Sequence, residues 1–380
     1  MRQAQPRGKR KEQEMKIYID NIIYALQKSG GISVYMHELS SRLLASCPEL
    51  RFIEQGDQSR NIVRRGFPIP SGNIIYESRL PLSLLRMLPV QASLQPGSIF
   101  HSSYYRITRQ KNVVNIVTVH DFSYELGYVK NGLRNYAHML QKKYAVEKAD
   151  GIICISENTR KDLLRFYKGI DENKIRVIYH AASEVFGKID STSSSNPGIL
   201  KLAGKKFILF VGARVNHKNF NVAVDTVKQT AGCHLVLVGG GTLSVNDAAL
   251  LDRELPGRHL HLDGISNADL NLLYRQAFCL LYPSSYEGFG IPILEAMQAG
   301  CPVVTTNRSS IPEVCGAAAL LVPEIEAEAF AARIEWLADA GERRQLIARG
   351  LKQAGNFSWD RAYQETLSFY REIHRNKFNG

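Results

Sequence analysis

Two series of short apolar runs, rich in β-branched residues, alternate along this chain with longer amphipathic segments. Runs that are apolar throughout are typical of strands buried on both faces of a parallel sheet, and the amphipathic segments are typical of the helices that cover it. The first series comprises 16–20, 98–102, 115–121, 151–156 and 176–180, and the second comprises 206–213, 234–241, 259–264, 278–284, 301–307 and 318–322. This alternation predicts an α/β fold with parallel sheets.

A stretch without apolar periodicity separates the two series. Residues 188–198 are rich in serine and end in Pro-Gly, a composition typical of a linker. The 380 residues also exceed what one core of ordinary size needs. We therefore predict two Rossmann-like domains over 15–187 and 201–356, a linker over 188–200, and a separate helical segment over 357–380.

The composition narrows the class of protein. The first 14 residues are basic and lack an apolar segment, so we predict no secretory signal peptide and either a disordered tail or an upstream start before a true beginning at Met15. No run reaches the roughly 18 to 20 apolar residues that a membrane span requires. None of the six cysteines forms a C-x-x-C pair, so we expect buried free thiols and a reducing cytoplasm.

The net charge of +12 predicts an anionic partner, such as a nucleotide, a nucleic acid or an anionic lipid surface. Binding of nucleic acid would need a basic face interleaved with aromatic side chains, and the sequence does not indicate one. We therefore predict no nucleic-acid partner.

The densest group of chemically useful residues lies in 284–295, between a predicted strand and a predicted helix. Gly288 and Gly290 permit a sharp turn and a close approach to a ligand, and free amides at the helix start favour a phosphate. Glu287 and Glu295 flank this turn, and carboxylates there suit the hydroxyls of a sugar or a ribose. The alternative is a tight strand-to-helix turn with a capping glutamate.

Two further segments follow the first strand of each predicted domain. Arg214 and Lys218 follow that of the second domain, where they would neutralise a diphosphate leaving group, and a solvated basic loop is the alternative. Gly30 and Gly31 follow that of the first domain and open a helix, which favours contact with a phosphate. An ordinary glycine turn before a helix is the alternative there.

Polar residues also end two strands of the first domain. His120 lies beside Asp121 at the end of 115–121, as a catalytic pair would, and the alternative is a structural histidine with satisfied hydrogen bonds. The segment 101–106, HSSYYR, would add a polar, aromatic rim to a cleft.

Several common motifs are missing. The glycines at 239–241 lack the later glycine and the acidic residue of a dinucleotide fingerprint, so we interpret them as a turn. The sequence contains no zinc-protease, serine-hydrolase or Walker A motif and no Asp-x-Asp. We therefore predict no cofactor and no bound metal.

A longer signature connects these residues to a family. Residues 282–316, YPSSYEGFGIPILEAMQAGCPVVTTNRSSIPEVCG, combine Glu-x7-Glu with A-x-G-x-P-V-V and S-S-x-P-E-V elements. With VEKADGIICISENTRKDLL over 146–164 and Phe-Ser-Trp at 357–359, the chain resembles family 4 of the retaining glycosyltransferases. The resemblance implies the GT-B fold, in which two Rossmann-like domains face each other across a cleft and a last helix crosses back to the first domain.

The resemblance implies roles for the signature residues. Glu287 would contact hydroxyls of the donor sugar, helped by the amides of Gly288, Phe289 and Gly290. Glu295 would hold the ribose of the donor.

The remaining candidates receive roles in the same way. Arg214 and Lys218 would bind the donor diphosphate, Gly30 and Gly31 would approach it from the other domain, and His120 would lie beside the reacting sugar. The family keeps the anomeric configuration of the donor and works without a metal.

We therefore expect a retaining, metal-independent glycosyltransferase that moves a sugar from a nucleotide-sugar donor to a glycan or lipid-linked acceptor in bacterial polysaccharide assembly. GDP-mannose is the favoured donor, because VHDFSYE and SENTRKDLL resemble segments of bacterial mannosyltransferases, and UDP- and dTDP-sugars are the alternatives. A sugar-nucleotide epimerase or hydrolase of the same fold and a non-catalytic GT-B scaffold are the alternatives.

A leucine-rich segment, RLPLSLLRMLPV at 79–90, predicts contact with a membrane. It is too short to span a bilayer, and its prolines limit a helix to about 81–88, so it would lie in the interface. We expect a cytoplasmic protein that docks on the anionic inner face of the membrane, helped by Lys142, Lys143 and Lys148. The alternative is that these leucines pack against the first sheet.

Overall fold

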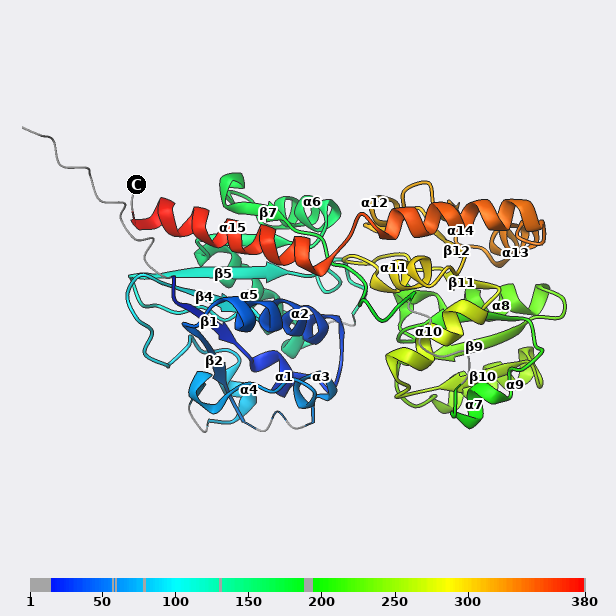
Figure 1. The fold of residues 1–380 in the computed structure, drawn as a ribbon, viewed down its shortest axis with the longest axis horizontal. Helices are drawn as coiled ribbons and strands as arrows, with labels where there is room; N and C mark the ends of the chain where they lie inside the picture. The colour runs from blue at the N-terminus through cyan, green and yellow to red at the C-terminus, as the bar shows by residue number, and fades with distance from the viewer. Residues whose placement is uncertain are drawn as a thin grey trace, which may run out of the picture.

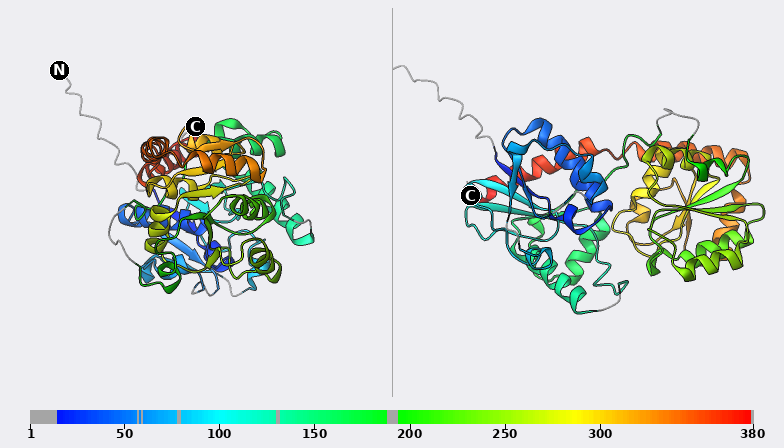
Figure 2. Two further views of the ribbon diagram at one scale, coloured as in Figure 1. Left: turned by 90° about the vertical axis from the view of Figure 1, so that its right-hand side faces the viewer. Right: turned by 90° about the horizontal axis from the view of Figure 1, so that it is seen from below.

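The computed structural model describes residues 15–56, 58, 60–77, 80–129, 132–187 and 194–378. Two α/β domains lie side by side along the long axis of the molecule, each built on one parallel sheet (Figures 1 and 2). This arrangement confirms the predicted fold class. The basic tail predicted over the first 14 residues lies outside the described residues, as do 188–193 of the predicted linker.

The first domain has the strand order β3-β2-β1-β4-β5-β6-β7. Its strands are β1 (Ile17–Asp20), β2 (Leu50–Glu54), β3 (Ile74–Tyr76), β4 (Ser98–Ser102), β5 (Val113–Val119), β6 (Gly151–Cys154) and β7 (Ile175–Val177). Its helices are α1 (Ile22–Leu26), α2 (Gly31–Ser46), α3 (Ile62–Arg65), α4 (Leu82–Leu85), α5 (Leu133–Lys148) and α6 (Glu157–Phe166), with 3-10 turns η1 (Ser71–Asn73) and η2 (Glu172–Lys174). All residues of β1, β4, β5 and β6 are buried, as expected for a covered parallel sheet.

The second domain has the strand order β10-β9-β8-β11-β12-β13. Its strands are β8 (Phe207–Val211), β9 (His234–Val238), β10 (His259–Leu262), β11 (Cys279–Tyr282), β12 (Val303–Thr306) and β13 (Leu320–Val322). Its helices are α7 (Pro197–Leu200), α8 (Phe220–Gln229), α9 (Val245–Glu254), α10 (Asn267–Gln276), α11 (Ile291–Gln298), α12 (Ile311–Cys315), α13 (Ala327–Trp336) and α14 (Ala340–Ala354), with the turn η3 (Asn216–Lys218).

In both sheets the strand order reverses beside the first strand of the domain. The reversal lies between β1 and β4 in the first sheet and between β8 and β11 in the second. Loops at the carboxyl ends of such strands diverge, which opens a crevice for a ligand. The glycine pair after β1, the basic loop after β8 and the signature after β11 are all at these two places.

Each predicted apolar run overlaps a strand. The alternation misses β2 and β3, which lie toward one edge of the first sheet. The charged Arg51 and Glu54 interrupt the apolar run of β2, and β3 has three residues that are not buried, so neither presents a long apolar run in the sequence. All six cysteines are free, and five of them are buried as expected.

The structure gives two local features in more detail. Helix α4 covers Leu82–Leu85, which lies within the limit of about 81–88 that the prolines set. Helix α7 lies within the segment predicted as a linker, and its Ile199 is buried in the core of the second domain.

The terminal helix α15 (Trp359–Phe378) crosses from the second domain and packs on the first, as the resemblance implied (Figure 1). Tyr363 shares a hydrogen bond of 2.6 Å with Ser46 on α2. Tyr370 bonds to the ring of His101 on β4, inside the domain. The last helix of the chain therefore completes the core of the first domain.

Candidate active site

The loop between β11 and α11 lies against the end of β5, across the domain boundary. A Cβ atom on Gly288 would lie 1.9 Å from the carbonyl oxygen of His120, so no larger residue fits in this contact. The hydroxyls of Ser156 and Thr159 donate to the carbonyl oxygen of Gly288, at 2.7 and 3.2 Å. The structure therefore brings two predicted site residues from different domains together.

Further hydrogen bonds hold the two domains in this contact. The carboxylate of Glu313, on α12, accepts hydrogen bonds of 2.9 Å from the backbone amides of Glu157 and Asn158 at the start of α6. A carboxylate is favoured there because the first amides of a helix lack partners within the helix and carry its positive dipole end. The hydroxyl of Tyr286 also accepts a hydrogen bond of 2.9 Å from the amide of Phe122.

Lys218 and Glu287 form an ion pair at the carboxyl end of the second sheet. Lys218 Nζ lies 2.7 Å from Glu287 Oε1 and 2.9 Å from the hydroxyl of Tyr282. The Ser284 hydroxyl donates to the same carboxylate oxygen at 2.6 Å. The Lys218 and Glu287 side chains are 15% and 12% exposed, so the pair is held firmly and can still be reached by a ligand.

The side chain of Arg214 points to the glycine turn after β9. Its guanidinium donates to the carbonyl oxygens of Gly239, Gly240 and Gly241 at 2.9, 3.2 and 2.9 Å, and it pairs with Asp247 at 3.2 Å. The three glycines have φ of 77°, 78° and 73°, which confirms the turn. Arg214 therefore organises this turn, and its contact with a diphosphate stays a prediction.

Glu295 lies on α11, behind the signature loop. Its carboxylate accepts a hydrogen bond of 2.9 Å from the Tyr274 hydroxyl. Burial raises the pKa of Glu295 to about 7, and the bond from Tyr274 offsets only part of this effect. Gly290 begins the helix at φ 103°, a backbone conformation that favours glycine, and Pro292 lies in the first turn as predicted.

Gly30 and Gly31 lead into α2. Among the described residues no side chain caps this helix, so its first amides are available to a ligand. A Cβ atom on Gly31 would meet nothing within 4 Å, and Ile32 beside it lines the cavity described below. The open start of α2 is consistent with the predicted contact to a phosphate.

His120 directly follows β5, and its imidazole is buried. No atom of the described residues forms a hydrogen bond with its Nε2. Burial lowers the pKa of His120 to about 4, although the charge of Asp121 acts in the opposite direction. The ring is therefore neutral at pH 7 and has a nitrogen to offer a ligand, which favours a role in the site over the alternative of a satisfied structural histidine.

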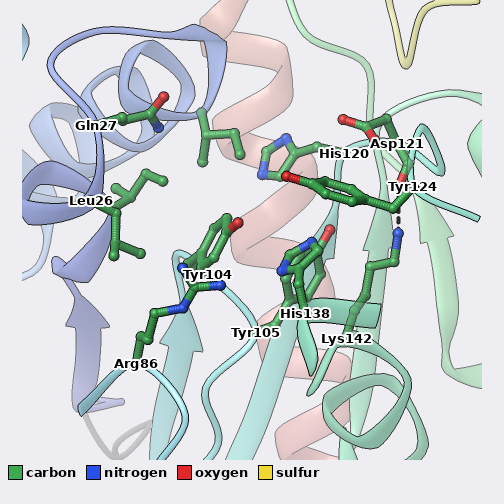
Figure 3. Close-up of a pocket in the computed structure, with 12 residues that line it drawn as sticks. Leu26, Gln27, Arg86, Tyr104, Tyr105, His120, Asp121, Tyr124, His138 and Lys142 are labelled. Carbon is green, nitrogen blue, oxygen red and sulfur yellow. Dashed lines mark hydrogen bonds between the residues drawn. The ribbon is translucent and has the colours of Figure 1, made fainter. Parts of the chain in front are cut away.

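A cavity of about 280 Å³ lies beside His120 at the carboxyl edge of the first sheet (Figure 3). Aromatic, charged and apolar side chains line it: Ile23, Leu26, Gln27, Ile32, Arg86, Tyr104, Tyr105, His120, Asp121, Tyr124, His138 and Lys142. The ring of His138 stacks on Tyr104 at 5.2 Å between centroids and lies 4.6 Å from Tyr124. Such a wall suits a ligand with both flat faces and polar groups, as a sugar has.

The sequence indicated part of this cavity. His120 and the aromatic segment that contains Tyr104 were predicted to line a cleft, whereas no place in this cavity was predicted for Arg86, Tyr124 or His138. Within the described part of the chain, no helix is long and apolar enough to cross a membrane. The same residues include no group of three or more His, Cys, Asp or Glu side chains that would hold a metal ion.

Known families match both domains of the chain. Residues 29–183 match the model of Glycosyltransferase Family 4, and residues 194–353 match the model of Glycosyl transferases group 1. The two matches divide the chain as the two sheets do.

Individual proteins are similar over different lengths. The chain is 30% identical over 237 residues to the O-antigen chain mannosyltransferase B of Escherichia coli, and the match covers 60% of this chain and 62% of that protein. It is 27% identical to the D-inositol 3-phosphate glycosyltransferase of Mycobacterium marinum, over 94% of this chain and 80% of that protein. The solved structure of Anabaena Alr3699/HepE in complex with UDP-glucose has the same fold, with a TM-score of 0.72 at 16% identity over 93% of this chain and 99% of that one.

Proposed function

Because the chain belongs to the family 4 glycosyltransferases of the GT-B fold, we propose that it transfers a sugar from a nucleotide-sugar donor to a hydroxyl of an acceptor. The observation that carries this proposal is the contact between the two carboxyl sheet edges. The Lys218–Glu287 pair lies on one side of it, and His120 with its cavity lies on the other. A donor on the second domain and an acceptor in the first would meet there.

The donor would be held by groups of both domains. Lys218 would neutralise the negative charge that develops on the diphosphate as the bond to the sugar breaks. Glu287 would accept hydrogen bonds from hydroxyls of the sugar, and Glu295 would accept them from the ribose. The open first turn of α2, at Gly30 and Gly31, would add amide donors from the opposite side.

We propose that the anomeric configuration is retained and that no metal or cofactor takes part. The acceptor oxygen would form its bond to the anomeric carbon on the face from which the nucleoside diphosphate leaves. The departing phosphate oxygen would take the proton of the acceptor hydroxyl. The close contact of Gly288 with His120 would exclude water and so limit hydrolysis of the donor.

GDP-mannose is the favoured donor, and polysaccharide or lipid-linked glycan assembly in bacteria is the favoured context. Both choices are supported by the name of the E. coli relative, an O-antigen chain mannosyltransferase. The match spans 62% of that relative, and the Anabaena protein of the same fold was solved with UDP-glucose, so the donor needs a direct test.

A panel of sugar nucleotides tests the proposal. One of them should raise the unfolding temperature and release its nucleoside diphosphate slowly in water, and Lys218→Met should abolish both effects. With an acceptor, the product should be a glycoside. Release of an epimerised sugar would indicate an epimerase, and a protein that responds to no sugar nucleotide would indicate a scaffold.

We also propose that the first domain docks on an anionic membrane face. The side chains of Leu84, Met87 and Leu88 are 57%, 41% and 38% exposed, whereas Leu85 is buried and attaches the segment to the domain. Arg79, at the start of the leucine-rich segment, lies outside the described residues. An exposed group of large apolar side chains is a common sign of an interaction surface.

The outer face of α5 extends this apolar surface. Leu133, Tyr136, Leu140 and Tyr144 are exposed and recur at helical spacing on one side of the helix. The leucine-rich segment and α5 are adjacent, because the side-chain amide of Gln141 on α5 donates a hydrogen bond to the carbonyl oxygen of Arg86. We propose that both sets of exposed apolar side chains enter the membrane interface.

The prediction that Lys142 contacts lipid is wrong. Its side chain is 1% exposed, and its Nζ donates at 2.9 Å to the carbonyl oxygen of Asp121 and at 2.8 Å to the carboxylate of Glu125. The reason is that Lys142 lies on the inner face of α5, opposite the apolar stripe. Lys143 and Lys148 are exposed and remain in the proposed membrane surface.

Vesicle flotation tests the docking. Binding should rise with the fraction of phosphatidylglycerol in phosphatidylcholine vesicles and fall as salt increases. Leu84→Glu should weaken binding, whereas Leu200→Glu, at an exposed leucine of the second domain, should not. Absence of binding at low salt to strongly anionic vesicles would refute the docking proposal.

A further inference from the structure

Arg86 lines the cavity and lies beside the exposed apolar segment. Its guanidinium carbon is 5.6 Å from the centre of the Tyr104 ring, on the side of the cavity away from His120 (Figure 3). No carboxylate of the described residues forms an ion pair with Arg86, and it is only partly exposed. A cation in such a place attracts an anionic ligand.

The other cations near this cavity are neutralised. Lys142, in its wall, pairs with Glu125 at 2.8 Å, and Arg106, behind it, pairs with Glu77 at 2.9 Å. Burial of a charge is costly unless it has a partner, and these pairs satisfy that requirement. Among the described residues Arg86 has no such ion pair, and Asp121, the carboxylate that also lines the cavity, lies at its His120 end (Figure 3).

His138 supplies a second unsatisfied group in the same wall. Its side chain is 4% exposed, and its Nδ1 has no hydrogen-bond partner among the described residues, although the rings of Tyr104 and Tyr124 lie on either side. Burial, Lys142 and Arg86 together lower its pKa to about 4. A buried polar atom without a partner is costly, and a ligand in the cavity would supply the missing hydrogen bond.

We propose that Arg86 and His138 form a subsite for a phosphate group on the acceptor. This inference rests on the proposed function, since it assigns the acceptor to the cavity of the first domain. The guanidinium of Arg86 matches a phosphate with paired hydrogen bonds. The acceptor sugar lies between the aromatic rings, and its reactive hydroxyl lies at the His120 end of the cavity.

The same phosphate chemistry has two sources, a soluble sugar phosphate and a sugar linked through phosphate to a lipid. Arg86 is followed in the chain by the exposed Met87 and Leu88. When a phosphate is bound at Arg86, a lipid chain attached to that phosphate would lie next to this apolar surface. A probe with an alkyl chain therefore distinguishes the two sources.

Calorimetry tests the subsite, with the nucleoside diphosphate of the donor at saturation so that the donor phosphate site is filled. The probes are mannose 1-phosphate, its dodecyl ester below the micelle concentration, and methyl α-mannoside. Mannose 1-phosphate should bind at least about tenfold more tightly than methyl α-mannoside. Arg86→Gln should remove this difference and leave methyl α-mannoside unchanged, whereas Arg134→Gln, at an exposed arginine of α5 outside the cavity, should behave as the wild type.

The outcomes separate the claims. Tighter binding of the dodecyl ester than of mannose 1-phosphate assigns a lipid-linked acceptor, and equal or weaker binding assigns a soluble anionic one. Equal affinity for mannose 1-phosphate and methyl α-mannoside, or no binding of either phosphate probe, overturns the subsite. Hydrolysis of the donor in water should be unchanged in the control Arg134→Gln, and its absence in the wild type would count against the proposed function instead.

Discussion

Single side chains in the cleft differ in how their surroundings set their charge. His120 is neutral because burial lowers its pKa. Glu287 has a cationic partner in Lys218 at 2.7 Å. Glu295 is partly buried, and the loss of solvent raises its pKa to about 7, although the hydrogen bond from a tyrosine hydroxyl acts in the opposite direction. These differences allow separate tests of residues that the signature motif treats alike.

Substitution Glu287→Gln should lower the turnover number by about tenfold or more, because the neutral amide loses the charge-assisted hydrogen bonds to the donor sugar. Steady-state kinetics with the donor from the panel measure this, and thermal unfolding checks that the variant is folded. Glu335→Gln, at an exposed glutamate of the same domain, serves as the control. A folded Glu287→Gln protein with wild-type turnover would refute the assignment.

Nucleotide binding should depend on the protonation of Glu295. Its pKa is raised to about 7, so the carboxylate is charged at pH 8 and mostly protonated at pH 6. The charged carboxylate accepts hydrogen bonds from the ribose hydroxyls. The affinity for the nucleotide should therefore fall by up to about tenfold as the pH is lowered from 8 to 6. Glu295→Gln should remove this part of the dependence. An identical pH profile in both proteins would show that another group titrates.

At the scale of elements, the segment around α4 depends on one buried arginine. A single helical turn is not stable on its own, so its position must come from tertiary contacts. Arg106 donates to the carbonyl oxygen of Leu88 at 3.1 Å and pairs with Glu77 at 2.9 Å and Asp20 at 3.3 Å. These contacts attach both ends of the apolar segment to the first sheet.

Arg106→Leu should therefore reduce the free energy of unfolding by about 3 to 5 kcal/mol, because two buried carboxylates lose their cationic partner. Denaturant unfolding followed by circular dichroism measures the loss. Arg109→Leu, at an exposed arginine three positions along, should change stability by less than about 0.5 kcal/mol. Equal losses in the two variants would mean that the buried pairs contribute nothing specific.

For the whole molecule, the contact between the domains brings the two halves of the site together. The carbonyl oxygen of Gly288 accepts hydrogen bonds from Ser156 and Thr159, and Glu313 binds the amide end of α6. These bonds join the signature loop of one domain to the helix after β6 of the other. The site is complete only while this contact is formed.

Gly288→Ala should keep the domains apart, since the added Cβ would lie 1.9 Å from the carbonyl oxygen of His120. Turnover should fall by at least about tenfold because donor and acceptor groups are displaced, while nucleotide binding to the second domain persists. Small-angle X-ray scattering should show a larger radius of gyration. Gly72→Ala, where a Cβ meets nothing within 4 Å, is the control, and wild-type scattering and turnover in Gly288→Ala would contradict this account.

The sequence by itself determined the two parallel sheets, the position of every predicted strand run and the turn at 284–290. These features leave local marks in the sequence, because a strand that is buried on both faces is apolar throughout and a tight turn needs glycine at fixed positions. The family signature added the crossing of α15, which the structure confirms. Strand β2 escaped prediction because Arg51 and Glu54 interrupt its apolar run, and β3 escaped because it is a three-residue edge strand that is buried at no position.

Only the tertiary structure decided which side chains meet. It placed Arg214 on the carbonyl oxygens of a glycine turn and buried Lys142 against Glu125, whereas a count of charges treats both as free cations. It also placed Arg86 and His138 in one cavity, although they come from different elements. The physical reason is that the partner of a charge is set by the packing of distant segments, and no local pattern in the sequence records that packing.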